Sequence, residues 1–333
     1  MSGPRASGGP RKGGQRRTGS QKAGSRRGGP QNVGKGNRGA ARAEPPPRRS
    51  ATGRPNKPGG GPGRGRGSGQ RGTSPLGKRD DRDGNKGLGG DQVEGRQAVR
   101  ELLLAGTRRT REVVLAGDLD AAPILDDIID LADEAKVTIR EVNRNRFENM
   151  ARTEAPQGVL AMAQPLHEYE FEDLLQPDAN GRDPFLLLLD GVTDPGNLGA
   201  ILRSAECAGV TGVVLPRHRA AGVTATVTKS AAGAIEHLRM TRVGGLPKAL
   251  ARMAEEGVWS VGLDAGGDAP IHQLTVADQP VALVMGAEGT GLSRLVRERC
   301  DTIAHIPLAG VLGSLNVSAA AAVALFEVAR CRT

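Results

Sequence analysis

The chain has 333 residues, enough for two ordinary domains, and a net charge of +9. Its strongly apolar runs, such as residues 185–189, are far shorter than the roughly 20 residues of a membrane span, so we expect no membrane association. Collagen and coiled-coil classes are excluded as well, because neither a Gly-X-Y period nor sustained heptads occur. Cys207, Cys300 and Cys331 are too few and too scattered for a disulfide framework or a zinc site, which fits a cytoplasmic protein.

The charge is distributed unevenly. Residues 1–90 contain 22 basic and 4 acidic residues, with 26 of the 49 glycines and 10 of the 21 prolines. Such a segment cannot bury enough apolar surface to offset the entropy lost on ordering. It also lacks an apolar stretch of the length found in secretory signals. We therefore expect a disordered basic tail, followed by a net acidic remainder that is long enough to bury a core.

Residues 91–166 read as a small α/β unit. Helical apolar spacing alternates there with short β-type runs. The predicted elements are a helix over 93–104, a strand over 112–116, a helix over 120–135, a strand over 137–142, a short helix over 145–151 and a strand over 159–163. A linker over 167–183 follows, in which Pro177 and Gly181 interrupt regular structure.

From residue 184 onward, strands and helices alternate. The predicted strands cover 185–189, 212–215, 238–243, 258–263, 281–285 and 302–306. The predicted helices cover 197–208, 231–236, 246–256, 291–297 and 316–330. This alternation predicts an α/β fold with a mostly parallel sheet and helices on both faces. Ligands of such sheets bind beyond the carboxyl ends of the strands, where three loops stand out.

The first loop, residues 190–203, passes through a Gly/Pro turn into a helix that Asn197 can cap. Arg203 follows six residues later, so it can project near the same end of the sheet, and its planar guanidinium suits a phosphate. A helix cap and an ordinary surface arginine would explain the same residues.

The second loop, residues 286–292, is glycine-rich but has neither the P-loop nor the Rossmann spacing. Tight-turn geometry alone can explain it. Glu288 would repel a phosphate and could instead accept a hydrogen bond from a ribose hydroxyl. The third loop, residues 306–318, places Ser314, Asn316 and Ser318 at a helix start, where one cap is enough.

Together these loops resemble the motifs of the SpoU (TrmH-like) branch of the SPOUT RNA 2′-O-ribose methyltransferases. The matching pieces are the spacing from Asn197 to Arg203, Met-Gly-Ala-Glu-Gly at 285–289, and Ile-Pro-Leu-Ala-Gly with Ser-Leu-Asn-Val-Ser within 306–318. The segment that begins Glu-Gly-Arg-Gln-Ala-Val resembles the small substrate-binding domain of the subgroup that methylates a guanosine of 23S ribosomal RNA. The tail has no counterpart in this pattern.

The resemblance implies a carboxyl-terminal trefoil knot, a homodimer with its site near the subunit interface, and S-adenosylmethionine as methyl donor, without a metal. It implies cofactor contacts from Gly286, Ile306, Ser314, Leu315 and Asn316. For catalysis we expect Arg203 to lie near the ribose hydroxyl and its phosphate, because a guanidinium stabilises developing negative charge. Asn197, Glu288, Ser314 and Asn316 would orient Arg203, the ribose and the cofactor.

Three functions remain open at this stage. The first is methylation of ribosomal RNA; the second is the same chemistry on transfer RNA or on an antibiotic-resistance site of ribosomal RNA; the third is a non-catalytic RNA-binding assembly factor. RNA affinity would come from local basic patches and from the tail, which would attract phosphates without reading sequence. A solubilising extension is the alternative explanation of the tail. The basic patches are Arg108, Arg109 and Arg111, and Arg217 with Arg219.

Overall fold

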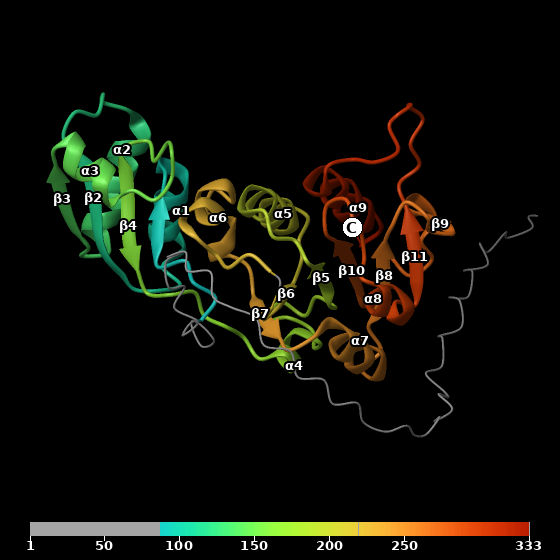
Figure 1. The fold of residues 1–333 in the computed structure, drawn as a ribbon. Helices are drawn as coiled ribbons and strands as arrows, with labels where there is room; N and C mark the ends of the chain where they lie inside the picture. The colour runs from blue at the N-terminus through green and yellow to red at the C-terminus, as the bar shows by residue number, and fades with distance from the viewer. Residues whose placement is uncertain (1–86, 219, 333) are drawn as a thin grey trace, which may run out of the picture. The chain divides into compact units, whose positions relative to one another are not determined.

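The computed structural model describes residues 87–218 and 220–332, and all of them fall within the same compact unit of the chain. Apart from residues 87–90, the predicted basic tail lies outside this range. Two sheets organise the described residues (Figure 1). Among these residues, no helix is both long and apolar enough to cross a membrane.

The first sheet has four strands in the order β1-β4-β2-β3. Strand β4 runs antiparallel to both neighbours, while β2 and β3 are parallel, so β1, β2 and β3 all point the same way. Helices α1 and α2 pack on one face through a shared apolar cluster, and α3 inserts Phe147 into the other face. The bounds are β1 Gln92–Glu94, α1 Arg96–Ala105, β2 Thr110–Ala116, α2 Pro123–Glu134, β3 Thr138–Val142, α3 Arg144–Met150 and β4 Val159–Ala163.

One prediction in this unit was wrong at its beginning. The helix expected from residue 93 starts at Arg96, and the residues before it form β1. Val93 pairs with Ala161 of β4 and is fully buried. Pairing with a strand nearly 70 residues away decided its conformation, and such a partner leaves no trace in local apolar spacing.

The second sheet has seven parallel strands in the order β7-β6-β5-β10-β8-β11-β9, which confirms the predicted parallel α/β architecture. Its strands are β5 Phe185–Asp190, β6 Gly212–Pro216, β7 Met240–Val243, β8 Trp259–Leu263, β9 Ala269–Pro270, β10 Val281–Gly286 and β11 Thr302–His305. Its helices are α4 Phe171–Leu174, α5 Pro195–Cys207, α6 Ala225–Ser230, α7 Leu246–Glu255, α8 Arg294–Arg299 and α9 Val317–Arg332.

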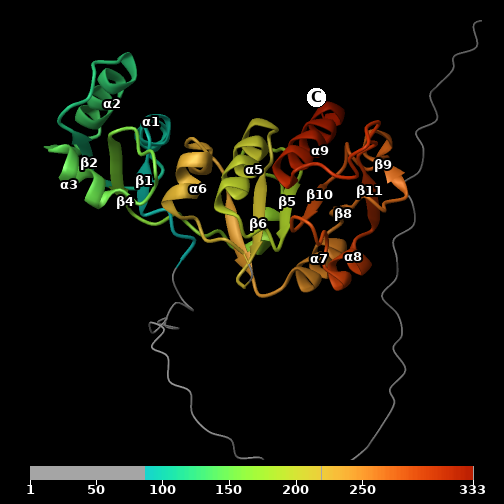
Figure 2. The same ribbon diagram turned by 45° about the horizontal axis from the view of Figure 1, so that its top comes forward.

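Helices cover both faces of this sheet, as predicted. Helices α5, α6 and α9 pack on one face, and α4, α7 and α8 pack on the other (Figure 1 and Figure 2). The side chains of residues 185–189 point alternately into the apolar cores on the two faces of the sheet, and all are buried. A continuous apolar run therefore indicates a central strand.

Several helix boundaries differ from the predictions. A helix was expected over 231–236, but α6 ends before it and only a short 3-10 turn, Ala234–Glu236, occupies that region. Helix α8 begins three residues later than expected, because Gly291 has φ 65° and belongs to the preceding loop. Helix α5 ends at Cys207, one residue before the predicted boundary. The short elements α4 and β9 were not predicted; α4 lies in the segment expected to be linker.

Candidate active site

A cavity of about 630 Å³ lies at the carboxyl ends of the central strands of the large sheet. Strand β10 lies between β5 and β8, and the loops after β8, β10 and β11 supply most of the wall. The start of α9 completes it through Val317 and Ala320. This is the edge at which open α/β sheets bind ligands.

The glycine-rich loop after β10 folds back on itself. Ala287 and Gly291 exchange backbone hydrogen bonds of 3.0 and 2.9 Å. A Cβ on Gly286 would lie 2.1 Å from the carbonyl carbon of Gly291, so only glycine fits there. The loop therefore lies close against the strand end and turns main chain toward the cavity, where Gly289 and Gly313 have open space on their Cβ side.

The five residues predicted to contact the cofactor all line this cavity: Gly286, Ile306, Ser314, Leu315 and Asn316. Glu288, which was predicted to orient ligands, lines it as well. They come from two loops that are separated by some 20 residues of sequence. The parallel order of the strands brings these loops together.

A chain of side-chain hydrogen bonds runs along the rim of the cavity. Asn316 Nδ2 donates to Asn197 Oδ1 over 3.0 Å, and Asn197 Nδ2 donates to Glu288 Oε2 over 3.1 Å. Asn316 Oδ1 in turn accepts from the backbone N–H and the hydroxyl of Ser318, at 2.8 and 2.6 Å. Asn316 therefore caps α9 and, through Asn197, fixes the carboxylate of Glu288.

The predicted capping role of Asn197 was wrong. Asp194 caps α5: its Oδ1 accepts a hydrogen bond of 2.6 Å from the backbone N–H of Asn197. An aspartate followed by Pro195 at the first helical position is a strong start signal. Because the aspartate performs the capping, the amide of Asn197 is free to join Asn316 to Glu288.

Arg203 is not brought to the cavity within one chain. It is exposed on α5 and does not line the cavity. Six residues separate it from Asn197, which places it roughly 9 Å farther along the helix axis. Its guanidinium has no hydrogen-bond or ion-pair partner among residues 87–218 and 220–332.

Asp264 was missed by the sequence reasoning. It follows β8, lines the cavity, and lies half-buried. Its Oδ1 accepts a 2.9 Å hydrogen bond from the backbone N–H of Gly266, and Arg297 lies 3.8 Å from the same oxygen. The signal was present in its position directly after a strand, at the same sheet edge as the three loops.

The charge of the lining indicates which ligand fits. Asp264 and Glu288 are its charged side chains, and among the described residues no lysine or arginine lines the cavity. A phosphate-bearing cofactor would be repelled, whereas hydroxyl groups and a positive charge are matched by carboxylates. Apolar walls suited to an adenosyl group come from Leu263, Ile306, Leu308 and Leu315. The residues present thus fit S-adenosylmethionine, whose sulfonium is cationic.

Cys300 contributes no nucleophile. Cys300 is buried at the end of α8, and desolvation raises the pKa of its thiol to about 12. A thiol with so high a pKa stays protonated at neutral pH. Within the described part of the chain, no group of three or more His, Cys, Asp and Glu is arranged to hold a metal ion.

Comparison with known proteins agrees with this geometry. Residues 184–326 match the model of the SpoU rRNA Methylase family, and residues 92–169 match that of the RNA 2′-O ribose methyltransferase substrate-binding domain. The chain is 42% identical over 242 residues to the 23S rRNA (guanosine-2′-O-)-methyltransferase RlmB of Photorhabdus laumondii, a match that covers 72% of this chain and 98% of the relative. It is 39% identical over 243 residues to RlmB of Escherichia coli K12, covering 73% and 99%.

Solved structures are similar over a comparable share of the chain. The SpoU methyltransferase AviRb of Streptomyces viridochromogenes superposes with a TM-score of 0.60 at 25% identity, covering 72% of this chain and 89% of AviRb. Its complex with the cofactor AdoMet (S-adenosylmethionine) gives a TM-score of 0.58 at 26% identity, with the same coverage. The chain therefore belongs to the SpoU rRNA methylase family and is an S-adenosylmethionine-dependent RNA 2′-O-methyltransferase.

Proposed function

We propose that this enzyme methylates the ribose 2′-oxygen of a guanosine in 23S ribosomal RNA. The observation that carries the proposal is the identity of about 40% with RlmB proteins over nearly their whole length, through both matched domains. The cavity at residues 285–291 and 306–317 supports the same chemistry from its own geometry.

The cofactor-binding residues in this proposal are Gly286, Ile306, Ser314, Leu315 and Asn316. When bound, S-adenosylmethionine supplies a methyl group that its sulfonium has already activated, so the protein need not activate the donor. Main-chain groups of the two loops hold the adenosyl part. The carboxylates of Asp264 and Glu288 stabilise hydroxyl and cationic groups of the ligand.

The acceptor requires more help, because a ribose hydroxyl is a poor nucleophile until its proton leaves. Asn197, Asn316 and Ser314 would hold Glu288 and the ribose in a fixed geometry, which lowers the entropic barrier to transfer. Arg203 would lie against the 2′-oxygen and the adjacent phosphate. Its guanidinium stabilises the negative charge that develops on the oxygen.

A homodimer follows as part of the proposal. Arg203 does not line the cavity of its own chain, so a second chain is needed to bring the two together. The loop before α9 exposes Val311 and Leu312 almost completely, and α9 exposes Val323 and Phe326. Apolar side chains gathered on one loop and one helix are typical of a surface that another subunit covers.

The remaining parts of the proposal concern organisation. Residues 1–90 act as a basic RNA-attracting tail, 91–166 as the RNA-binding domain, 167–183 as linker and 184–333 as the methyltransferase domain with its carboxyl-terminal trefoil knot. Ribosomal RNA as substrate places the enzyme in the cytoplasm. These assignments rest on the family resemblance and on the two separate sheets.

In vitro methylation tests the substrate. The purified full-length chain is incubated with labelled S-adenosylmethionine and either 23S ribosomal RNA or transfer RNA from a strain that lacks the enzyme, and the modified nucleotide is mapped. We expect one guanosine of 23S ribosomal RNA to gain a 2′-O-methyl group. Labelling of transfer RNA alone, or of neither RNA, would contradict the proposal.

Mixed dimers test the shared site. Arg203→Ala and Asn316→Ala chains, each inactive alone, are co-expressed with different affinity tags and purified through both tags. If one chain supplies Arg203 to the other chain's cavity, the mixed dimer has one intact site and regains up to half of the wild-type activity. A mixed dimer as inactive as its parents would contradict a shared site.

A further inference from the structure

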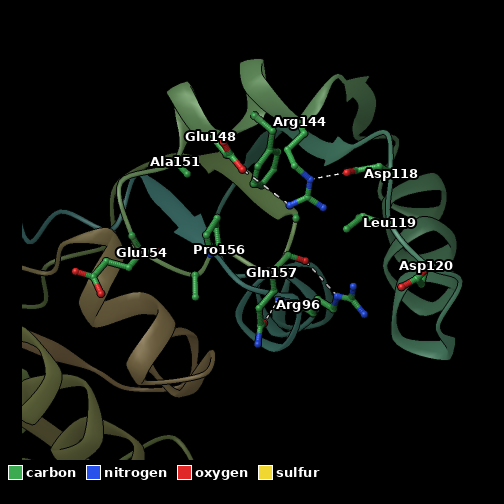
Figure 3. Close-up of a pocket in the computed structure, with 14 residues that line it drawn as sticks. Arg96, Asp118, Leu119, Asp120, Arg144, Glu148, Ala151, Glu154, Pro156 and Gln157 are labelled. Atoms are coloured by element: carbon green, nitrogen blue, oxygen red, sulfur yellow. Dashed lines mark hydrogen bonds and ion pairs between the residues drawn. The ribbon is translucent and has the colours of Figure 1, made fainter.

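A second cavity, of about 510 Å³, lies in the small sheet, outside the methyltransferase site. Its walls come from the first residue of α1, the loop after β2, helix α3 and the loop before β4 (Figure 3). Because β1, β2 and β3 point the same way, their carboxyl ends meet at this edge. The small sheet therefore has a cavity at the same kind of edge as the large sheet.

The loop before β4, residues 151–158, is anchored by a buried carboxylate. Glu94 is fully buried, and its oxygens accept hydrogen bonds from the backbone N–H groups of Arg152 and Thr153, at 2.7 and 3.0 Å, and from the Thr153 hydroxyl. Gln92 donates to the same carboxylate over 2.7 Å. A buried carboxylate with four donors holds this loop in one conformation.

The far end of the same loop is fixed to α1. Gln157 has φ 57°, an uncommon conformation for a residue with a side chain. Its Oε1 accepts a 3.0 Å hydrogen bond from the backbone N–H of Arg96, and its backbone oxygen accepts one of 3.2 Å from Arg96 Nε. Gln157 lines the cavity, and its side-chain NH₂ has no hydrogen-bond partner among the residues that the structure describes. Strained backbone that is held on both sides is a feature of preformed binding sites.

Arg144 lines this cavity from α3, and two carboxylates lie beside its guanidinium. It forms an ion pair with Asp118 and lies 4.0 Å from Glu148, as the dashed lines of Figure 3 mark. The hydrogen bond from Arg144 lowers the pKa of Asp118, so the pair stays charged at neutral pH. About half of the Arg144 side chain is exposed, so its planar guanidinium is accessible to a stacking partner.

The chemistry of the lining favours a nucleobase over a phosphate. Arg96 and Arg144 are outnumbered by Asp118, Asp120, Glu148 and Glu154, so a phosphate in the cavity would meet net repulsion. Apolar surface comes from Leu119, Phe147 and Pro156. Unpaired bases of RNA are recognised by stacking on aromatic rings or guanidinium planes and by hydrogen bonds to their edges.

We propose that this cavity binds one unpaired nucleobase of the RNA substrate, stacked on the guanidinium of Arg144. Glu148 accepts from the base edge, and the free amide NH₂ of Gln157 donates to it. The proposal rests on RNA being the substrate, and it assigns to the front domain a base-reading site rather than general attraction to phosphates.

The test measures binding of the full-length chain to a fluorescent transcript of large-subunit ribosomal RNA, without cofactor and at several salt concentrations. Arg144→Ala removes the platform and the charge, and Arg144→Lys keeps the charge but not the plane. Arg146→Ala is the matched control. Arg146 is an exposed arginine on the same helix, and it does not line the cavity. Chemical probing of the bound transcript reports which bases each protein protects.

We expect both Arg144 variants to bind about tenfold more weakly than wild type, the range of a lost stacking contact, and Arg146→Ala to stay within twofold. One base should lose its protection with both Arg144 variants and keep it with Arg146→Ala. Since no phosphate contact is lost, the slope of log Kd against log salt should be unchanged in Arg144→Lys.

Three results would overturn the proposal: wild-type affinity of Arg144→Lys, equal losses in Arg144→Ala and Arg146→Ala, or protection that changes only along the backbone. The second and third would indicate that the helix attracts phosphates. Binding is measured without methyl transfer, so the two proposals can fail separately. An enzyme that failed to methylate this RNA would contradict the proposed function, while the binding data would still test the base-binding cavity.

Discussion

The two cavities lie at equivalent places on two different sheets, yet their linings are opposite in kind. The cavity of the large sheet is built from glycine-rich main chain and two carboxylates, and none of its lining residues in the described part of the chain is basic. The cavity of the small sheet is built from long side chains, among them Arg96 and Arg144. Parallel strands provide a shared edge for a ligand, and the loops alone decide which ligand binds.

The two cavities also differ in the hydrogen bonds that hold their residues in position. Around the methyltransferase cavity, an exposed chain of amides and a carboxylate joins Asn316 to Glu288. Around the small-sheet cavity, the fully buried Glu94 holds a loop through four hydrogen bonds. The first network can exchange partners with a ligand, whereas the second can act only as a scaffold.

We expect the largest effect at the contact between the small-sheet unit and the large-sheet unit. Arg108 donates two hydrogen bonds to Glu236, at 2.8 and 2.7 Å, and both side chains are almost completely buried. Glu236→Ala leaves a buried guanidinium without its carboxylate, which costs about 3–5 kcal/mol. Urea unfolding measures this. The exposed pair formed by Glu255 is the control, since Glu255→Ala should cost less than about 1 kcal/mol.

If cofactor binding and RNA binding involve separate residues, Arg203→Ala should lower kcat without changing the affinity for the cofactor. If Arg203 acts on the RNA, kcat falls roughly 10²–10³-fold, the cost of losing a group that stabilises developing charge. The Kd for S-adenosylmethionine, measured by calorimetry, stays at the wild-type value because Arg203 does not line that cavity. A comparable loss of affinity for S-adenosylmethionine would show that Arg203 also contributes to cofactor binding.

The core of the large sheet should respond to alkaline pH through Cys300. The folded-state pKa of its thiol is raised from 9.0 to about 12, so the unfolded chain releases this proton first. Stability from this group is complete below pH 9 and is lost as pH rises toward 12, by about 1 kcal/mol at pH 10. Urea unfolding from pH 8 to 10 should have a flatter pH dependence in Cys300→Ala, and an unchanged slope would contradict burial of the thiol.

A smaller effect is expected from removing one negative charge from the cofactor cavity. It tests whether the carboxylates there favour a cationic ligand. Asp264→Asn keeps a hydrogen-bond acceptor for Gly266 and removes the negative charge. We expect the KM for S-adenosylmethionine to rise about fivefold, equivalent to about 1 kcal/mol, with little change in kcat. Asp268→Asn, an exposed position outside the cavity lining, should leave both constants unchanged.

Much of the fold could be predicted from the sequence because its central strands are extreme in composition. The runs at 185–189 and 281–285 form β5 and β10, which pair with each other in the middle of the sheet. Predictions failed where a distant partner decided the conformation, as at β1, or where an element has only a few residues, as at α4 and β9. Local periodicity carries no record of such partners.

The candidate site divides in the same way. The glycines and small polar residues of the loops at 286–292 and 306–318 indicated a ligand site by their type and by their position after strands. The role of Asn197 could not be derived, since its hydrogen bonds depend on residues 91 and 119 positions away. Asp264 was missed because a single aspartate after a strand is a weak signal by itself.

The sequence by itself determined the parallel architecture, the loops that would carry the chemistry and the family to which they belong, because strand composition and loop spacing are local properties of the chain. Only the tertiary structure decided which loops share a cavity, that Asn316 and Asn197 hold Glu288, and that Arg203 lies away from the cofactor cavity of its own chain. The strand order β5-β10-β8-β11 sets these distances, and that order arises from packing of the whole sheet.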